Sequence, residues 1–570
     1  MRHLKWYYLI VLGLSILPLI SIFTIPQFPH VHDGIVHLAR MGAYFKALQD
    51  FQIPVRWAGD LNYGYGMPLF NFIYHVPYLL SSLFISLGFG LVGTFKIVLS
   101  LSFLLSGAFM FAFAKAFFKD DKKALLVAVF YQFAPFRFIE MFVRGSLGEV
   151  YTYAFFPAVL FGLTLLFRKI SIRHVVITAF ATALLILSHN ALSLTFFGIC
   201  ILFILFFAKS RKNIVLALTS LFLGLMLSSF YWVPAIFEHK YTYGDLFMKD
   251  VFRFHFPPIQ NFFIPNFTNA KFLQTGGISV HIGLFHSIAL LLSVIMLLSV
   301  RKLNNRHSGD LERSVEDSRI SYRGWRFWAS QNDGKMILFC LLVFLTAIFF
   351  MSSLSIFIWE RVSFLRQFQF SWRFLGVVIF ATSLMSLSFF YINIFKKKWV
   401  FITLITLVVC STLYYWRPPL GFETIDEKYY WKYPLNTTYF GETDVIWSAG
   451  GKSSYPKQRV EVIGGKAIIK NFKKKSNLHT FLVDAQSKAQ LVDHTQYFPG
   501  WRVMVDNKEV KIEFQDPNNR GEITFWVPKG RHFVEIKFKE SQIRLFSDVL
   551  SIATLIGIFV VIVARKILIK

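Results

Sequence analysis

Charged residues and cysteines are scarce in this sequence. Only 16% of its 570 residues are charged, whereas soluble domains carry about 25%. Its three cysteines, Cys200, Cys340 and Cys410, lie inside apolar runs and form no Cys-x-x-Cys pair, so disulfides and a cysteine zinc site are not expected. The sequence also lacks a Gly-x-x-x-x-Gly-Lys-Ser/Thr phosphate loop and a Gly-x-Ser-x-Gly motif, and therefore gives no sign of a P-loop enzyme or a serine hydrolase.

Acidic residues are also few: 32 Asp and Glu stand against 60 Lys and Arg, for a net charge of +28. On a soluble protein this excess would suggest nucleic-acid binding. Apolar runs of about 20 residues recur along the chain, however, and such runs are long enough to cross a bilayer. The basic residues gather in alternate loops between the runs, as the positive-inside rule expects. We therefore predict a polytopic membrane protein that contacts membrane lipids and no nucleic acid.

The apolar runs predict about 12 spans, the first of them uncleaved because no small-residue cleavage site follows it. The charge pattern places both termini in the cytoplasm. Residues 68–92 would invert every later loop if they crossed the membrane, so we expect them to lie in the interface or to re-enter. Pro68 and Pro77 fit such a broken segment. The predicted spans are 7–24, 93–115, 122–139, 150–168, 174–189, 191–208, 213–233, 284–300, 336–352, 374–394, 399–415 and 546–564.

After Arg417 the hydrophobicity drops and apolar and polar residues alternate. The segments QRVEVIGGKAIIKNF, TFLVDAQSKAQLVDH, GWRVMVDNKEVKIEF and GEITFWVPKGRHFVEIKF carry turn residues between them, which predicts a β-sandwich. We expect a transmembrane domain with catalytic outer loops at 1–415, an extracytoplasmic β domain at 416–545, and a last span with a basic tail at 546–570. The β domain either binds sugar or polymer or serves as a lid or scaffold.

Residues 29–40, PHVHDGIVHLAR, gather titratable side chains at the end of the first apolar run. If a helix begins at Gly34, Asp33 is its N-cap, and His37 and Arg40 follow one and two turns later on the same face. Three interpretations of Asp33 stay open: a helix cap, a base that takes a proton from an attacking hydroxyl, or one ligand of a divalent metal. The metal site would comprise His30, His32, Asp33 and His37.

The motif VRGSLGEV, residues 143–150, joins two predicted spans on the outer face. Its glycines allow a tight turn and a close approach of the backbone to a ligand. One interpretation is an ordinary loop with an Arg144–Glu149 ion pair. The other makes Arg144 a phosphate contact and Glu149 a second acid near Asp33.

Two further motifs fall on the same face. ILSHNAL puts His189 at a tight outer turn, where a structural role in a helical hairpin is the simpler interpretation. RQFQFSWRF carries Arg366, Gln369 and Arg373 among aromatic residues. An aromatic belt with snorkelling arginines explains part of this pattern, and two arginines one to two turns apart would also clamp a phosphate.

The order of these motifs resembles that of the GT-C superfamily of membrane glycosyltransferases. An Asp follows the first span in HDGIVHLARMGAYFKALQDFQIPVRWAGDLNYGYGMPLFNF, and RGSLGE, LSHN, FYWVPAIFE and QFQFSWRF come after it. The closest likeness is to the bacterial membrane proteins labelled "6-pyruvoyl-tetrahydropterin synthase-related", although none of that soluble enzyme's zinc chemistry is visible. The segment YFPGWRVMVDNKEV resembles the outer domain of bacterial proteins that add sugars to cell-envelope polymers.

The resemblance implies transfer of a sugar from a polyprenyl-phosphate donor to an envelope glycan, polymer or lipid acceptor, usually with inversion at the anomeric carbon. It also implies a first-loop base, matched by Asp33, and a second acid, matched by Glu149; we expect His37 to tune or orient the base. Metal dependence stays open, because His32 stands where several families have another acid. The residues predicted to bind substrate or phosphate are Arg56, Arg144, His189, Arg366, Gln369 and Arg373.

Two other functions remain in view. A lipid-linked saccharide or polymer transporter would use the arginines and histidines to line a pathway, but its polar residues should be spread through the membrane depth. In this sequence they gather at one end of the spans, which favours an enzyme. A non-catalytic protein that binds envelope polymer through its β domain is the third candidate.

Overall fold

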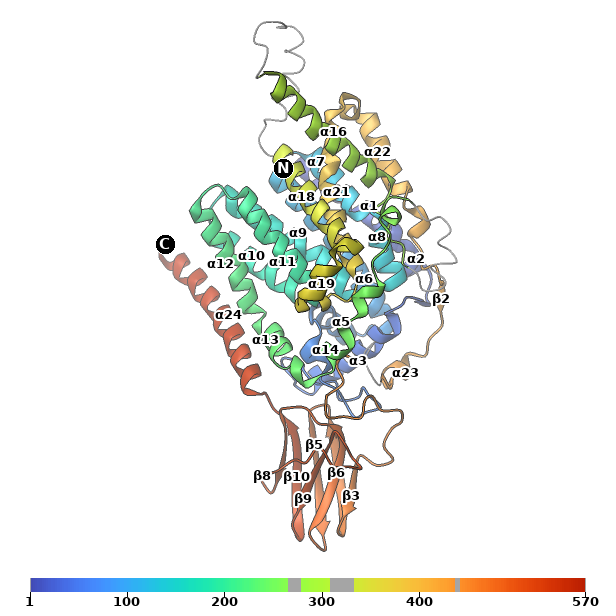
Figure 1. The fold of residues 1–570 in the computed structure, drawn as a ribbon. Helices are drawn as coiled ribbons and strands as arrows, with labels where there is room; N and C mark the ends of the chain where they lie inside the picture. The colour runs from blue at the N-terminus through green and yellow to red at the C-terminus, as the bar shows by residue number, and fades with distance from the viewer. Residues whose placement is uncertain (1, 265–277, 308–332, 436–440, 569–570) are drawn as a thin grey trace.

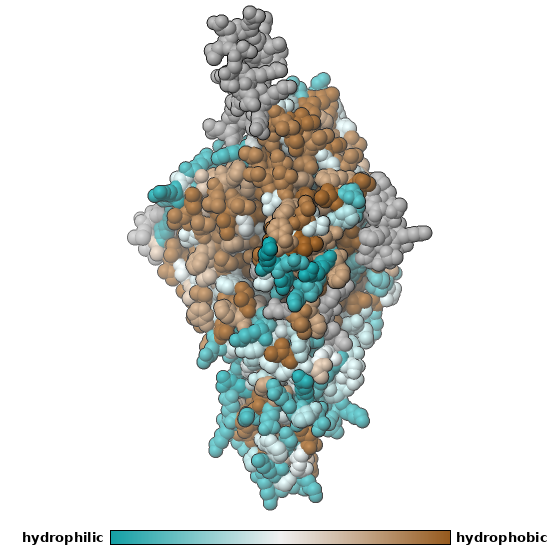
Figure 2. Space-filling model, viewed as in Figure 1, coloured by the Kyte–Doolittle hydropathy of each residue, from teal (hydrophilic) through white to brown (hydrophobic). Residues whose placement is uncertain are grey.

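The computed structural model describes residues 2–264, 278–307, 333–435 and 441–568. A body of helices carries a β domain at one end, and both chain termini lie toward the opposite end of the body (Figure 1). The surface of the body is mainly hydrophobic, whereas the β domain is more hydrophilic (Figure 2). This distribution fits a body embedded in lipid and a domain in water.

Long apolar helices build the body. The described residues contain eight helices long and apolar enough to cross a membrane, or up to ten if each bent pair is one span. The eight segments are Trp6–Thr24, Leu91–Phe118 (α6), Leu147–Arg168 (α9), Asn190–Phe207 (α11), Asp333–Met351 (α18), Ser371–Tyr391, Lys398–Tyr415 and Gln542–Arg565. The first contains α1 (Arg2–Ile16) and α2 (Ile20–Thr24), and the last three contain α21 (Leu375–Met385), α22 (Lys398–Cys410) and part of α24 (Gln542–Leu568).

The remaining predicted spans correspond to bent or shorter helices. The bent pairs are α7 (Asp121–Gln132) with Pro135–Arg144, at 52°, and α12 (Arg211–Leu227) with α13 (Ser229–Phe237), at 70°. Shorter apolar helices occupy Ile172–Ile186 (α10) and Leu284–Ser299 in α16. The twelve predicted spans are therefore all helical, but α10 and the apolar part of α16 (Leu284–His307) are shorter than a usual span.

Residues 68–92 do not form a spanning helix. They contain α4 (Leu69–Phe72) and α5 (Val76–Ser86). With 11 residues, α5 extends about 16 Å at roughly 1.5 Å per residue, only about half the thickness of a hydrocarbon core. This is the short, broken segment that the charge pattern requires.

The β domain is a sandwich, as the alternating pattern predicts. Within residues 441–568, a five-stranded sheet has the order β4-β5-β10-β7-β8 and a three-stranded sheet the order β3-β6-β9. Phe481 and Val483 of the first sheet share a core with Leu491 and Phe525 of the second. The strands are β3 (Val460–Gly464), β4 (Ala467–Lys475), β5 (Leu478–Ala485), β6 (Ala489–Gln496), β7 (Trp501–Val505), β8 (Lys508–Val510), β9 (Glu522–Val527) and β10 (Gly530–Phe538).

The first loop is built into the β domain. Trp57 is almost fully buried in the sandwich core, and its ring centroid lies 5.4 Å from those of Trp501 and Phe538. Nearer the body, β1 (Phe28–Pro29) pairs antiparallel with β2 (Phe422–Glu423). These contacts fix the β domain against the loop that carries Asp33.

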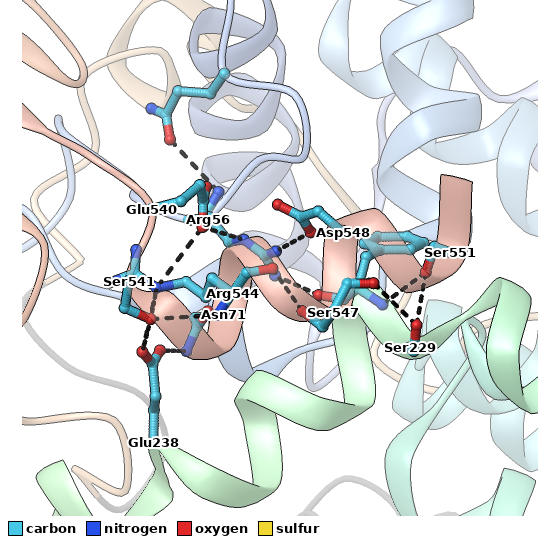
Figure 3. Close-up of polar contacts among 12 residues, drawn as sticks. Arg56, Asn71, Ser229, Glu238, Glu540, Ser541, Arg544, Ser547, Asp548 and Ser551 are labelled. Atoms are coloured by element: carbon cyan, nitrogen blue, oxygen red, sulfur yellow. Dashed lines mark hydrogen bonds and ion pairs between the residues drawn. The ribbon is translucent and has the colours of Figure 1, made fainter. Parts of the chain in front are cut away.

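A buried polar network, which we call the α24 anchor, joins the last helix to three earlier segments (Figure 3). It comprises Arg56, Asn71, Glu238, Arg544 and Asp548. Arg544 Nε lies 3.2 Å from Glu238 Oε1, and Asn71 Nδ2 donates to Glu238 Oε2 at 2.8 Å. Arg56 Nη2 lies 2.7 Å from Asp548 Oδ1. Since both arginines are about 1% exposed or less, these contacts compensate charges that water does not reach.

Replacing Arg544 with Met is expected to lower the free energy of unfolding by about 3–5 kcal/mol, because Glu238 would be left buried without its cation. Thermal unfolding of the purified protein in detergent measures the effect. The control is Arg531→Met, since the Arg531 side chain is 88% exposed and its replacement should cost at most about 0.5 kcal/mol. Equal unfolding temperatures for the two variants would show that the anchor carries no stability.

Candidate functional site

A cavity of about 2170 Å³, which we call the main cavity, is lined by residues of α3 (Gly34–Gln49) and α13, and both helices lie at the end of the body nearer the β domain (Figure 1). Its wall is drawn from the first loop, the ends of several spans and the loop before α21. These segments are far apart in sequence, so the fold gathers polar side chains that the sequence scatters. The sequence-predicted residues on its wall are His32, Asp33, His37, Arg144, His189, Arg366, Gln369 and Arg373.

Asp33 immediately precedes α3 (Gly34–Gln49) at the N-cap position, yet its side chain makes no capping hydrogen bond. The side chain is partly exposed and lines the main cavity. Its backbone N–H donates to the carbonyl of Arg144 at 2.9 Å, which docks the first loop onto the end of the Pro135–Arg144 segment. The carboxylate is therefore held in the cavity wall without being used to cap the helix, which leaves the cap interpretation without its expected contact.

His37 lies one turn into α3 and is buried. Its Nε2 accepts a hydrogen bond from the backbone N–H of Leu147 at 3.3 Å, so Nδ1 carries the proton and donates to Tyr78 Oη at 3.0 Å. Burial lowers the pKa of His37 well below its ordinary value, and Arg40 and Arg144 lower it further. His37 is thus a neutral side chain that ties α3 to the start of α9.

The predicted metal ligands do not converge. Within the described part of the chain, no three His, Cys, Asp or Glu side chains form a group that could hold a metal ion. His30 pairs instead with Glu423 at 3.6 Å, and both ring nitrogens of His37 already have partners. These four residues therefore do not fit a divalent-metal site.

A buried ion cluster lies beneath one wall of the cavity. Arg144 Nη1 is 2.8 Å from Glu140 Oε2 and 2.8 Å from Glu149 Oε2. Arg373 Nε is 3.1 Å from Glu149 Oε1, and His189 Nε2 is 3.7 Å from the same oxygen. Glu140 and Glu149 are fully buried, so the two carboxylates hold the two guanidinium groups in place from behind.

Gly145 and Gly148 allow this cluster to form. Gly145 has φ of +63°, and a Cβ there would lie 2.3 Å from a side-chain carbon of Val31. A Cβ at Gly148 would lie 2.4 Å from the Tyr74 ring. The motif RGSLGE therefore needs both glycines, one for a left-handed turn and both for close packing.

The cavity wall also carries guanidinium groups beside this cluster. Arg144 pairs with both carboxylates through Nη1, and its guanidinium carbon lies 4.7 Å from the centroid of the Trp372 ring on the cavity wall. Arg366 donates to the backbone carbonyls of Trp359 and Glu360 and forms no ion pair within the described chain. Arg40 lines the cavity, and its buried Nε has no hydrogen-bond partner there. An anionic group would be stabilised by these side chains.

Sequence reasoning placed Arg40 on the same face as Asp33 but gave it no role, and it missed Glu140. Glu140 is a single carboxylate at the end of an apolar run, four residues before Arg144. That isolation is the signal that could have identified it, because a carboxylate at membrane depth needs a partner. Arg40 could have been found from its position two turns after Asp33.

Two sequence-predicted polar residues lie elsewhere. Arg56 is not on the cavity wall but in the α24 anchor, where Asp548 compensates its charge. Glu149 is behind the wall and is not among the residues that line the cavity. Glu149 therefore contacts the arginines of the cluster and does not face the space in which a substrate would bind.

One side of the cavity is apolar. Its lining there includes Ile186, Leu194, Phe197, Leu225 and Ile236, which come from α10 to α13 or their ends. Leu194 and Ile236 are 40% and 63% exposed on the hydrophobic body. The main cavity thus joins a charged region to a surface suited to hydrocarbon.

The sequence of residues 70–418 matches the family described as "6-pyruvoyl-tetrahydropterin synthase related domain; membrane protein". The chain belongs to this family. The family region includes the ion cluster and the RQFQFSWRF motif, whereas Asp33 lies before it. The protein is accordingly a multi-pass membrane protein, as its composition and helices indicate.

One relative is an uncharacterized protein of Lactococcus lactis subsp. cremoris (strain MG1363), 24% identical over 243 residues. The match covers 40% of this chain and 39% of the relative, so the chain spans about two fifths of that protein's length.

Three solved structures are partly similar to this chain. The mycobacterial arabinofuranosyltransferase AftD has a TM-score of 0.40 at 16% identity, covering 74% of this chain and 27% of AftD. The oligosaccharyltransferase of Archaeoglobus fulgidus has a TM-score of 0.40 at 16% identity, covering 74% and 54%. ArnT of Cupriavidus metallidurans, bound to undecaprenyl phosphate, has a TM-score of 0.28 at 12% identity, covering 67% and 77%.

Proposed function

We propose that this protein transfers a sugar from a polyprenyl-phosphate-linked donor to a hydroxyl group of a cell-envelope acceptor, with Asp33 as the general base. The observation that carries the proposal is the composition of the main cavity. It combines a partly exposed carboxylate, guanidinium groups without ion pairs in the described chain, and an apolar side. These are the contacts that an acceptor hydroxyl, a lipid phosphate and an isoprenoid chain respectively require.

In the proposed reaction, the acceptor oxygen attacks the anomeric carbon while the Asp33 carboxylate takes the hydroxyl proton. The bond between the anomeric carbon and the phosphate oxygen breaks, and its electron pair stays on the phosphate. Arg40, Arg366 and Arg144 stabilise the charge that develops there. Attack from the face opposite the leaving phosphate inverts the anomeric configuration.

The proposed orientation places both termini in the cytoplasm and the β domain outside. Figure 1 supports it, because both termini lie at the end of the body away from the β domain. The main cavity would then face the exoplasmic leaflet, where cytosolic nucleotide sugars are absent and a lipid-linked donor is the available substrate.

The proposal is tested by incubating the purified chain, in phospholipid nanodiscs, with radiolabelled polyprenyl-phosphate sugars and candidate envelope acceptors. We expect labelled acceptor to form and polyprenyl phosphate to be released in equal amounts. Movement of intact donor across the bilayer without cleavage would identify a transporter instead. Binding of acceptor with neither cleavage nor movement would identify a non-catalytic protein.

Replacing Arg366 with Gln is expected to raise the KM for the lipid donor about 10-fold to 100-fold, because a charge-assisted contact to phosphate contributes roughly 1.5–3 kcal/mol. Initial rates at varied donor concentration give KM. Arg361→Gln is the matched control: Arg361 is exposed, lies in the preceding helix α19 (Ile356–Arg361) and does not line the cavity. The same KM for both variants would rule out a phosphate contact by Arg366.

A further inference from the structure

A second, smaller cavity lies where the first loop meets the β domain. Its volume is about 350 Å³, within the range of small-molecule sites. We call it the basic pocket. It is lined by Lys46, Asp60, Tyr63, Gly64, Lys432, Tyr455, Pro456, Arg459 and Lys474. Neither the ion cluster nor Asp33 borders it, so the chemistry of the main cavity does not account for these residues.

Positive charge exceeds negative charge in the basic pocket. Four of its side chains are cationic and one, Asp60, is a carboxylate. Lys46 Nζ and Lys474 Nζ share that carboxylate, at 2.7 and 3.2 Å. Lys432 is exposed and has no ion pair among the described residues. A concave, positively charged site of this kind attracts anions.

Arg459 is held at the back of the pocket by the β domain. Its Nε lies 3.6 Å from Asp493, whose other oxygen is 2.7 Å from His479 Nδ1. Arg459 also donates to the carbonyl of Gly64 and to the Thr495 hydroxyl. These contacts connect the β domain to the first loop and fix a guanidinium group in the pocket wall.

Two aromatic rings form the rest of the wall. Tyr63 and Tyr455 lie edge to face, with ring centroids 5.3 Å apart. Tyr63 has φ of +52° and follows Asn62 at +55°, a backbone conformation that costs free energy in non-glycine residues and is common at ligand sites. Aromatic rings present flat apolar faces, on which the C–H face of a pyranose packs.

We propose that the basic pocket binds an acidic oligosaccharide, with Lys432, Lys46 and Lys474 facing its carboxylate or phosphate groups and Tyr63 and Tyr455 against its sugar rings. The pocket is next to the main cavity, because Lys432 lines the pocket and Leu435 lines the cavity. Three residues span at most about 11 Å. A glycan of a few units would reach from one site to the other. The identification of the bound glycan as the acceptor rests on the proposed function. The binding of an acidic glycan in the pocket does not rest on it.

Isothermal titration calorimetry of the full chain in phosphatidylcholine nanodiscs tests the proposal, with tetragalacturonic acid as probe and neutral maltotetraose as comparison. We expect the wild type to bind tetragalacturonic acid saturably and maltotetraose at least about 10-fold more weakly. Lys432→Glu should bind tetragalacturonic acid at least about 10-fold more weakly than the wild type does. Lys428→Glu is the matched control, since Lys428 is exposed on α23 (Glu427–Tyr430), one turn before Lys432, and does not line the pocket. It should bind within about twofold of the wild type.

Absence of saturable binding by the wild type would overturn the proposal. Equal losses of affinity for the acidic probe in Lys428→Glu and Lys432→Glu would also overturn it, because they would show a general attraction to a basic surface. Loss of binding when phosphatidylglycerol replaces phosphatidylcholine would assign the pocket to a lipid headgroup instead. Asp33→Asn should bind the probe as the wild type does. Binding of the probe in the basic pocket is thus tested separately from sugar transfer, because a protein that does not transfer sugar could still bind the probe.

Discussion

Replacing Asp33 with Asn is expected to lower the kcat for sugar transfer by about 10²- to 10⁴-fold, the usual contribution of a positioned general base. Asn has nearly the same size as Asp and caps helices equally well, but it cannot accept the proton of the acceptor hydroxyl. The KM for the lipid donor should change little, because the guanidinium groups of the cavity are retained. Initial rates with varied donor and acceptor separate the two parameters.

The structure makes this substitution a clean test. The Asp33 side chain makes no capping hydrogen bond, so the change breaks no such bond at the start of α3, and the backbone bond from Asp33 to Arg144 is retained. We therefore expect the unfolding temperature of Asp33→Asn to equal that of the wild type. Unchanged turnover in a folded variant would remove Asp33 from the reaction.

Replacing Glu149 with Ala is expected to destabilise the protein by about 3–5 kcal/mol, because Arg373 and part of the Arg144 charge would be left buried without compensation. The carboxylate is fully buried and contacts both guanidinium groups. Thermal unfolding in detergent measures this loss. Adding Arg373→Met to Glu149→Ala should recover part of the stability, since it removes the uncompensated cation.

Glu149→Gln separates support from catalysis at this position. Gln keeps the shape of the side chain but holds the arginines less firmly, so the KM for the donor should rise while kcat falls much less than in Asp33→Asn. Glu149 would then be a positioning residue for Arg144, which contacts the lipid phosphate in the proposed reaction. A fall in kcat as large as that of Asp33→Asn, with KM unchanged, would instead make Glu149 a second catalytic acid.

The fold was predictable wherever one local pattern decides the outcome. Alternation after Arg417 predicts strands, and Asp506-Asn507 does form a tight turn between β7 and β8, with φ of +49° and +64°. Lengths of apolar runs predict the helices. The bend after α7 has a local signal in Pro135, which begins the next helix, whereas the bend between α12 and α13 has no proline at its break. The last helix begins at Gln542, four residues before the predicted start, and its first turn carries Arg544, which is buried in the α24 anchor.

The site was less predictable, because a sequence does not show which side chains pair. Arg56 and Arg366 are both arginines in predicted outer loops, yet Arg56 forms an ion pair with Asp548, which is more than 490 residues away in the sequence. Glu149 follows Arg144 by five residues, so an ion pair was foreseeable, but Arg373 as its second partner was not. Which polar side chains line the main cavity depends on these long-range contacts.

The central claim is that a lipid-linked sugar occupies the main cavity with its phosphate on the arginines and its anomeric carbon toward Asp33. A cryo-EM structure of the wild-type protein with a non-transferable polyprenyl-phosphonate sugar tests it most directly. We predict phosphonate oxygens within about 3 Å of Arg40 or Arg366, the isoprenoid chain beside Leu194 and Ile236, and the anomeric carbon within about 6 Å of Asp33. A headgroup bound outside the main cavity, or one that turns its anomeric carbon away from Asp33, would contradict the account.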